Sequence, residues 1–370
     1  MKPTKVFLCG DVMTGRGIDQ ILKYPSSPEI FESYVRDARD YVKLGEKYQN
    51  KIPRMVDPEY IWGDALKEWK QRKVNASIVN LETSITKSDH YWPNKGINYR
   101  MNPKNIDVLT CAKFDACSLA NNHILDWGEE GLLETILTLK KSGIKFCGAG
   151  RNIHEAQKAA ILNLPEGNRL LIFSIGLPSS GIPETWEATE TDPGVYLLRN
   201  IEEGIYSIER QLRKKKRKED IVIISVHWGG NWGYIIPHDH IKFAHMIIDN
   251  LDVDIIHGHS SHHPLGLEIY RKKLILYGCG DFINDYEGIS GMDSYRSDIH
   301  LMYFLSIDST NKELLSLEIV PLKTMGFSLH YASEKDSEWI TNLLNEKSKQ
   351  FDMIFKKTQS GQILASRKSA

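Results

Sequence analysis

Histidine is concentrated in one short stretch of this sequence. Residues 254–263 read DIIHGHSSHH, and this stretch places His257, His259, His262 and His263 close together after an apolar run. Such a cluster either binds a metal ion, because imidazole is the commonest metal-ligating side chain in proteins, or forms a polar loop. The stretch by itself leaves both uses open. The choice between them depends on whether other ligands lie nearby.

Four other segments carry metal-compatible side chains directly after apolar runs. They provide carboxylate, amide and imidazole groups, namely Asp11 in LCGDVMTGRG, Glu82 in VNLETS, Asn122, His123 and Asp126 in LANNHILDWG, and His227 in ISVHWGGNWG. One such residue alone is usually a turn former or a hydrogen-bonded structural group. Several of them together, with mixed oxygen and nitrogen donors, suit Mn, Fe or Zn better than Mg or Ca. We therefore expect one or two divalent metal ions, since a pair bridged by a carboxylate can activate water.

The elements that must position these groups are short apolar runs alternating with helical patterns. The runs predict buried strands and cover residues 5–11, 76–82, 115–123, 169–176, 220–230, 252–259 and 273–281. Helical patterns cover residues 57–73, 129–143 and 237–251. This alternation predicts an α/β core, and open α/β sheets place their sites at the carboxyl ends of the strands.

The chain is expected to form one domain with a small appendage. The domain spans residues 1–325, and residues 20–56 are interpreted as an insertion beside the first strand. From about residue 300 the pattern changes to two strands that suit a hairpin. Residues 326–370 are expected to form a C-terminal helix and a frayed tail.

Composition and charge exclude several function classes. The formal net charge of −1 over 370 residues argues against general binding to nucleic acid or to anionic membrane surfaces. The basic run at residues 213–218 is interpreted as a solvated helix end. The five cysteines are scattered without a CxxC pair, which is typical of reduced thiols. No apolar run suits a signal peptide or reaches the roughly 20 residues of a membrane helix. We expect a cytoplasmic protein without membrane insertion.

Six motifs in order resemble the CapA family of poly-γ-glutamate capsule synthesis proteins. They are GDVMTGR, NLETSIT, ANNHILDWG, VHWGGNW, GHSSHHPLGLE and YGCGDF, and the resemblance runs from about residue 4 to residue 325. It implies the calcineurin-like metallophosphatase fold, a four-layer αββα sandwich with mixed sheets. It also implies a metal-dependent hydrolase acting on a phosphoester or a γ-glutamyl-type bond. The alternative is a non-catalytic accessory subunit that binds the acidic polymer or a synthetase partner.

The resemblance assigns roles to individual residues. It implies metal ligation by Asp11, Glu82, Asn122, His227, His259 and His262, with Glu82 as the bridging carboxylate. His123 would be the acid that protonates the leaving group, and Asp126 would hold its imidazole in one tautomer. Arg16 and Arg100 would bind the substrate through their guanidinium groups. The alternative for each arginine is an intramolecular ion pair.

This sequence departs from the family pattern at several positions. Met13 stands where metallophosphatases carry a histidine, and two serines separate the histidines of GHSSHH. Asp281 stands where asparagine is common, and its carboxylate either reaches the metal or caps a turn. His257 is a weaker candidate that lies behind the ligands. His263 is left out of the ligand set.

Overall fold

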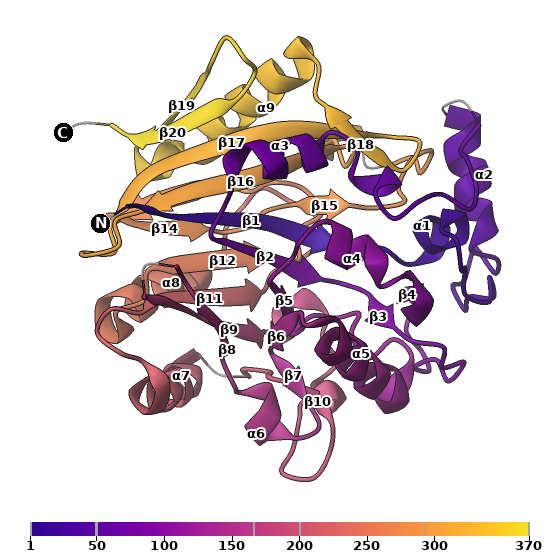
Figure 1. The fold of residues 1–370 in the computed structure, drawn as a ribbon, viewed down its shortest axis with the longest axis horizontal. Helices are drawn as coiled ribbons and strands as arrows, with labels where there is room; N and C mark the ends of the chain where they lie inside the picture. The colour runs from indigo at the N-terminus through magenta and orange to yellow at the C-terminus, as the bar shows by residue number, and fades with distance from the viewer. Residues whose placement is uncertain (1, 49–50, 166, 200, 292, 369–370) are drawn as a thin grey trace.

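Two mixed β-sheets lie face to face, and helices cover the outer face of each sheet (Figure 1). The computed structural model describes residues 2–48, 51–165, 167–199, 201–291 and 293–368. The arrangement is the predicted α/β fold class, a four-layer αββα sandwich with mixed sheets, and this prediction is confirmed. Within the described residues, no helix combines the length and the hydropathy that crossing a membrane requires.

The larger sheet carries the first motifs of the sequence. Its strands are β1 (Thr4–Val12), β2 (Ala76–Leu81), β5 (Ala116–Ser118), β6 (Lys145–Cys147), β15 (Asp281–Ile283), β16 (Ile299–Ile307), β17 (Leu314–Met325), β18 (Ser328–Tyr331), β19 (Met353–Lys357) and β20 (Ile363–Arg367). They lie in the order β19-β20-β17-β16-β1-β2-β5-β6, with β15 paired to β1 and β18 paired to β17. β1, β2, β5 and β6 run parallel, whereas β16 and β17 extend the sheet in antiparallel pairing.

The smaller sheet carries the fourth and fifth motifs. Its strands are β8 (Ala160–Asn163), β9 (Arg169–Gly176), β11 (Ile221–His227), β12 (Ile255–His259), β13 (Leu267–Tyr270) and β14 (Lys273–Leu276). They lie in the order β13-β14-β12-β11-β9-β8, and β9, β11, β12 and β14 run parallel. Two short strand pairs lie outside these sheets: β3 (Ser84–Ile85) with β4 (Arg100–Met101), and β7 (Ala149–Gly150) with β10 (Gly194–Val195).

Helices form the two outer layers. They are α1 (Arg16–Ile21), α2 (Arg39–Tyr48), α3 (Ala65–Arg72), α4 (Asp107–Cys111), α5 (Gly128–Ser142), α6 (Ile153–Ala156), α7 (Ile201–Lys215), α8 (His238–Leu251) and α9 (Glu334–Lys347). Apolar residues of α3, α4 and α5 pack on the outer face of the larger sheet. Those of α7 and α8 pack with the strands of the smaller sheet.

Two of the three helical patterns agree with the structure, and the third is shorter than predicted. α5 and α8 match the patterns at 129–143 and 237–251. The pattern at 57–73 gives a single 3-10 turn at Tyr60–Trp62 followed by α3, because Gly63 interrupts it with φ of +43°. A Cβ atom at this position would lie 2.1 Å from the carbonyl oxygen of Leu329, so the close approach of β18 requires glycine.

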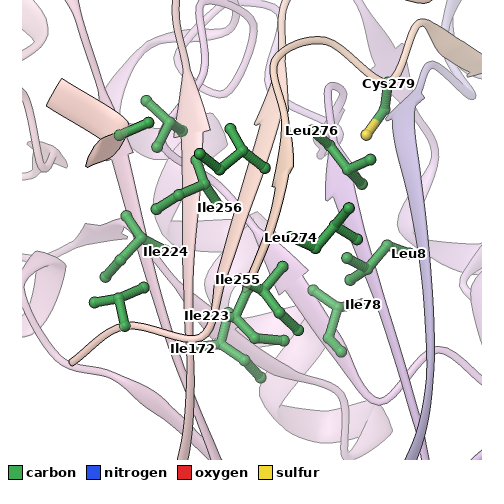
Figure 2. Packing of buried hydrophobic residues seen from close by; sticks show 14 of the residues in the cluster. Leu8, Ile78, Ile172, Ile223, Ile224, Ile255, Ile256, Leu274, Leu276 and Cys279 are labelled. Carbon is green, nitrogen blue, oxygen red and sulfur yellow. The ribbon is translucent and has the colours of Figure 1, made fainter. Parts of the chain in front are cut away.

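The main hydrophobic core lies between the two sheets. Figure 2 shows Leu8 of β1 and Ile78 of β2 opposite Ile255 and Leu274 of the smaller sheet. Successive side chains of a strand point to opposite faces, so Phe7 of β1 belongs instead to the cluster under α3 and α5. Burial on both faces explains why these strands appear as continuous apolar runs.

The C-terminal end of the chain is a β-hairpin, and the expectation of a frayed tail is wrong for residues 363–367. β19 and β20 pair in antiparallel fashion, and β20 also pairs with β17 of the larger sheet. Ile363 is fully buried in the core between the sheets, whereas the neighbouring Leu364 is 47% exposed. Tertiary pairing therefore orders a segment whose short, polar-flanked sequence gave no strand pattern of its own.

A buried arginine ties the predicted insertion to the sheets. Arg16 begins α1, and its guanidinium donates to Asp285 through Nε at 3.1 Å and to Glu32 through Nη1 at 3.1 Å. Its side chain is 1% exposed and lies over the ring of Tyr41, 3.8 Å from the ring centre. Glu32 and Tyr41 both come from residues 20–56, and Asp285 follows β15. The ion pairs therefore hold this segment against the end of the larger sheet.

We expect substitution of Ile363 by alanine to destabilise the protein. The change leaves a cavity in the core between the sheets, and the cost is about 2–5 kcal/mol in the free energy of unfolding. Leu364→Ala, one residue away on the exposed face, is the matched control and changes it by less than about 0.5 kcal/mol. Urea unfolding followed by circular dichroism measures both. Equal effects of the two substitutions would contradict the pairing of β20.

Removal of the Arg16 charge is expected to lower stability rather than substrate affinity. Arg16→Met leaves two buried carboxylates without their partner, at a cost of about 3–5 kcal/mol. The control is Arg39→Met, because Arg39 forms an exposed pair with Asp37 that is worth at most about 1 kcal/mol. Thermal unfolding of the two variants provides the comparison. A variant at position 16 with wild-type stability would contradict the structural role.

Candidate metal centre

Parallel strands bring the predicted residues to one end of the two sheets. In the smaller sheet, His227 and His259 are the last residues of β11 and β12 and lie opposite each other in register. In the larger sheet, Asp11 of β1 pairs with Asn80 of β2 on one side and with Asp281 of β15 on the other. Because neighbouring parallel strands end at the same edge, their terminal side chains converge there.

These side chains form two groups that could each hold a metal ion. One group consists of Asp11, His227 and His259, and the other of Asp11, His262 and Asp281. Within each group the ligand atoms lie within 4.8 Å of one another, and all five side chains are buried. Asp11 belongs to both groups, so one carboxylate serves two adjacent candidate positions.

Glu82 lies beside Asp11, directly after β2. The Asn80 amide donates to Asp11 Oδ1 at 2.7 Å and to Glu82 Oε2 at 3.1 Å, and so holds the two carboxylates next to each other. The carboxylate shared by the two groups is that of Asp11. The bridging role of Glu82 therefore stays a prediction.

Burial and mutual repulsion act on all of these carboxylates. Burial, followed by the charge of Asp281, raises the pKa of Asp11 to about 7. Burial, followed by the charges of Asp11 and Asp281, raises the pKa of Glu82 well above its usual value. Enclosed like charges of this kind are costly unless a cation balances them. The donor set, carboxylates with imidazoles, therefore fits one or two divalent ions such as Mn, Fe or Zn.

A hydrogen-bond chain behind His259 fixes which of its nitrogens is free. His257 Nε2 lies 2.7 Å from the carbonyl oxygen of Cys9, which can only accept, so this nitrogen carries the proton. Burial lowers the pKa of His257 to about 4, and the neutral ring accepts from the Ser225 hydroxyl at Nδ1, at 3.0 Å. The Ser225 oxygen accepts from His259 Nε2 at 2.8 Å. His259 therefore presents an unprotonated Nδ1 to the metal group, and His257 lies behind it.

His227 connects Asn122 to the first group. Its Nδ1 lies 2.8 Å from His259 Nδ1, and its Nε2 lies 3.1 Å from Asn122 Oδ1. The two nitrogens of one imidazole thus each contact another predicted ligand. The structure therefore brings Asn122, His227 and His259, three of the residues that the resemblance implies as metal ligands, into contact.

Asp281, whose role the sequence left open, fixes the second group. Its Oδ1 accepts from His262 Nδ1 at 2.8 Å, and its Oδ2 accepts from Asn284 Nδ2 at 2.7 Å. The residue is 2% exposed and lies next to Asp11 in the strand pairing. This position favours the first of the two alternatives, a carboxylate within reach of the metal.

His123 and Asp126 form a hydrogen-bonded pair at the edge of the centre. His123 Nδ1 lies 2.7 Å from Asp126 Oδ2, which also accepts from the backbone nitrogen of Tyr99 at 2.6 Å. The other ring nitrogen, Nε2, lies 3.7 Å from Glu82 Oε1 and faces the carboxylates. Burial lowers the pKa of His123 to about 4, with Asp126 acting to raise it and Lys95 acting to lower it further.

Sequence reasoning assigned no role to three residues that support the centre. These are Asn80, which holds Asp11 and Glu82, Ser225, which orients His259, and Lys95, which contacts Asp126. Asn80 and Ser225 each stand two residues before a predicted ligand, and this strand period places them on the same face. Lys95 lies in the segment PNKGINYR, and nothing in its spacing connects it to the ligands.

The two arginines and His263 make their hydrogen bonds with residues outside the two ligand groups. Arg100 Nη1 donates to the Ser88 carbonyl at 2.6 Å and pairs with Asp89 at 2.7 Å, and its guanidinium lies over the Trp127 ring. The structure therefore favours the ion-pair alternative for Arg100, as it does for Arg16. His263 Nδ1 faces the Pro264 carbonyl, and its ring stacks on Tyr295.

Comparisons with known proteins agree with the motifs. Residues 5–286 match the family described as bacterial capsule synthesis protein PGA_cap. The chain is 42% identical over 348 residues to a probable polyglutamine synthesis accessory protein of Mycobacterium tuberculosis, which covers 94% of this chain and 91% of that protein. It is 25% identical over 353 residues to the PGA biosynthesis protein CapA of Bacillus subtilis, which covers 94% and 78% of the two chains.

Among solved structures, the chain is similar to a novel phosphatase of Mycoplasma pneumoniae. The TM-score is 0.48 at 12% identity, and the match covers 87% of this chain and 94% of the other. The family match includes all six strand-end motifs, from GDVMTGR to YGCGDF. The resemblance stated from these motifs is confirmed: the chain belongs to the PGA_cap family of bacterial capsule synthesis proteins.

Proposed function

We propose that this protein is a metal-dependent hydrolase. The observation that carries the proposal is the pair of ligand groups that share Asp11, with the His123–Asp126 pair beside them. One group has Asn122 beside it, the second is completed by Asp281, and Glu82 lies next to Asp11, so the set offers ligands for two ions. Bound Mn, Fe or Zn would supply a Lewis acid and lower the pKa of water at this position.

His123 is proposed to move the proton in the reaction. Because Asp126 accepts the Nδ1 proton, the neutral ring presents its Nε2 lone pair toward Glu82 and the ligand groups. Burial lowers the pKa of His123, so the ring does not hold a second proton in advance. It takes a proton at Nε2 from the attacking water and releases it to the leaving group. The second of these steps is the acid role that the resemblance implies for His123.

The proposed substrate is a phosphoester or a γ-glutamyl-type bond. The ligand groups suit either class, since both reactions develop negative charge on an oxygen that a Lewis acid stabilises. The γ-glutamyl class is supported by the relatives, one named for the synthesis of PGA and one for the synthesis of polyglutamine. The five unpaired cysteines support a cytoplasmic location.

A second candidate function is that of an accessory subunit. The relative with 42% identity is named a probable polyglutamine synthesis accessory protein. In that case the chain binds an acidic polymer or a synthetase and hydrolyses nothing. The same ligand groups would then serve to hold a structural ion.

The metal content of the purified protein tests whether it binds an ion, which both candidate functions assume. We expect purified protein to contain one or two equivalents of Mn, Fe or Zn by elemental analysis, and His259→Ala to lose at least half of it. A ligand at about 100 times its Kd stabilises a fold by about 2.7 kcal/mol, so chelation should lower the Tm and re-addition should restore it. His90→Ala is the control, because His90 is 86% exposed. Protein that binds no ion under these conditions would contradict the metal centre.

Hydrolysis separates the two candidates. With the native metal, we expect wild-type protein to cleave a phosphoester or a γ-glutamyl peptide in a substrate screen. His123→Gln should lower kcat by about 10²–10⁴-fold and leave the metal content unchanged, because the substitution removes a proton-transfer group. His90→Gln again serves as the control.

Polymer binding gives the complementary result. Wild type and His123→Gln are titrated with poly-γ-glutamate while hydrolysis is followed. Equal binding by both proteins, with no cleavage of any tested substrate, would exclude the hydrolase and support the accessory subunit.

A further inference from the structure

Lys95 places an ammonium group against the carboxylate that orients His123. Its Nζ lies 2.7 Å from Asp126 Oδ1, 2.9 Å from the Ile97 carbonyl oxygen and 3.0 Å from His123 Nδ1. The Lys95 side chain is 13% exposed and that of Asp126 is fully buried. A charged pair with so little solvent is screened weakly, so this contact matters more than a surface ion pair.

The short contact between His123 Nδ1 and Asp126 Oδ2 favours one placement of the proton on His123. An unprotonated Nδ1 would face the Asp126 carboxylate at 2.7 Å, and two acceptors at that distance repel each other. Nδ1 therefore carries the proton and donates it to Asp126. Lys95 donates to the Ile97 carbonyl and forms an ion pair with Asp126 Oδ1. Its ammonium lies near His123 Nδ1 because Lys95 and His123 both contact the carboxylate of Asp126.

Asp126 is thus held from three sides. The His123 ring and the Tyr99 backbone nitrogen donate hydrogen bonds to Oδ2, and the Lys95 ammonium forms an ion pair with Oδ1. With Lys95 present, the carboxylate has a cation on one oxygen and the imidazole on the other. Without it, Oδ1 would be a buried charged oxygen with no cation beside it, and the carboxylate could rotate away from His123.

The segment that carries Lys95 is itself fixed to the same aspartate. The Trp92 backbone nitrogen donates to the Asp126 carbonyl at 2.7 Å, and the Trp92 ring packs edge-on against Trp186. Lys95 lies over that same Trp186 ring, 5.7 Å from its centre. The segment between β3 and β4 therefore delivers the ammonium group to a set position beside His123.

We propose that Lys95 is a positioning residue for the hydrolase: through Asp126 it keeps the His123 ring oriented with Nδ1 protonated and Nε2 facing the ligand groups. This inference rests on the proposed function for its effect on the reaction. The effect of Lys95 on the orientation of the His123 ring does not depend on whether the protein hydrolyses a substrate. Lys95 acts through another residue and is not assigned a contact with the substrate.

Kinetics of a double-mutant cycle test the proposal. Lys95→Met, Asp126→Asn and the double variant are compared, with Lys87→Met as the control from the exposed part of the same segment. We expect Lys95→Met to lower kcat by about 10–100-fold, as loss of a group behind an active residue typically does, with KM changed less than about twofold. The double variant should be no worse than Asp126→Asn, because both changes act through one carboxylate. Lys95→Arg, which keeps the charge, should recover most of the activity.

Two kinetic outcomes would overturn the positioning role. One is a raised KM with unchanged kcat in Lys95→Met, which would indicate direct substrate binding. The other is additivity with Asp126→Asn. Thermal unfolding of each variant identifies any that fail to fold, and Lys95→Gln replaces Lys95→Met in that case.

Nitrogen NMR of metal-free protein tests the ring orientation without activity. With ¹⁵N-labelled histidine and a His123→Gln spectrum for assignment, wild type should show the Nδ1–H tautomer at His123, and Lys95→Met should show a mixture of both tautomers. An unchanged tautomer in folded Lys95→Met, or an Nε2–H tautomer in wild type, would refute the proposal. If wild type hydrolyses nothing, the proposed function fails, and this measurement still decides the role of Lys95.

Discussion

The arrangement of the whole centre depends on burying Asp11 beside other carboxylates. Asp11 lies in β1, in register with Asp281 on one side and beside Glu82 on the other, and all three are enclosed at the end of the two sheets. Burial raises the pKa of Asp11 and of Glu82, which measures how unfavourable their charge is without a counterion. A fold that buries these carboxylates together needs a cation to balance their charge. The surrounding imidazole and amide groups are suited to bind a metal cation.

The two-sheet architecture places imidazole ligands next to the buried carboxylates. The larger sheet contributes Asp11 and Asp281, the smaller sheet contributes His227 and His259, and the loop after β12 contributes His262, so each ligand group combines residues from both halves of the fold. The apolar residues between the sheets, such as Leu8 and Ile255, fix their spacing. Packing of the core therefore sets the distance between the ligands that the two sheets contribute.

Hydrogen bonds on the side of each histidine away from the centre then determine which ring nitrogen faces the centre. The chain from Cys9 through His257 and Ser225 leaves one nitrogen of His259 free for a metal, and Asp126 does the corresponding task for His123. Arg16 and Arg100, which the resemblance implies as substrate-binding residues, make buried contacts that hold the segments around the centre. Charged side chains near this site thus serve mainly to fix its shape.

The sequence by itself determined the fold class, the family and the strand-end positions of the ligands, because these follow from local patterns: apolar runs, parallel-strand ends and ordered motifs. Tertiary structure decided the rest. The order in β20 depends on pairing with β17, and Lys95 meets Asp126 only because the segment between β3 and β4 folds over it. The sharing of Asp11 by two groups depends on distances between strands of different sheets. Contacts between residues far apart in the chain leave no periodicity or spacing from which they can be read, so only the folded chain reveals them.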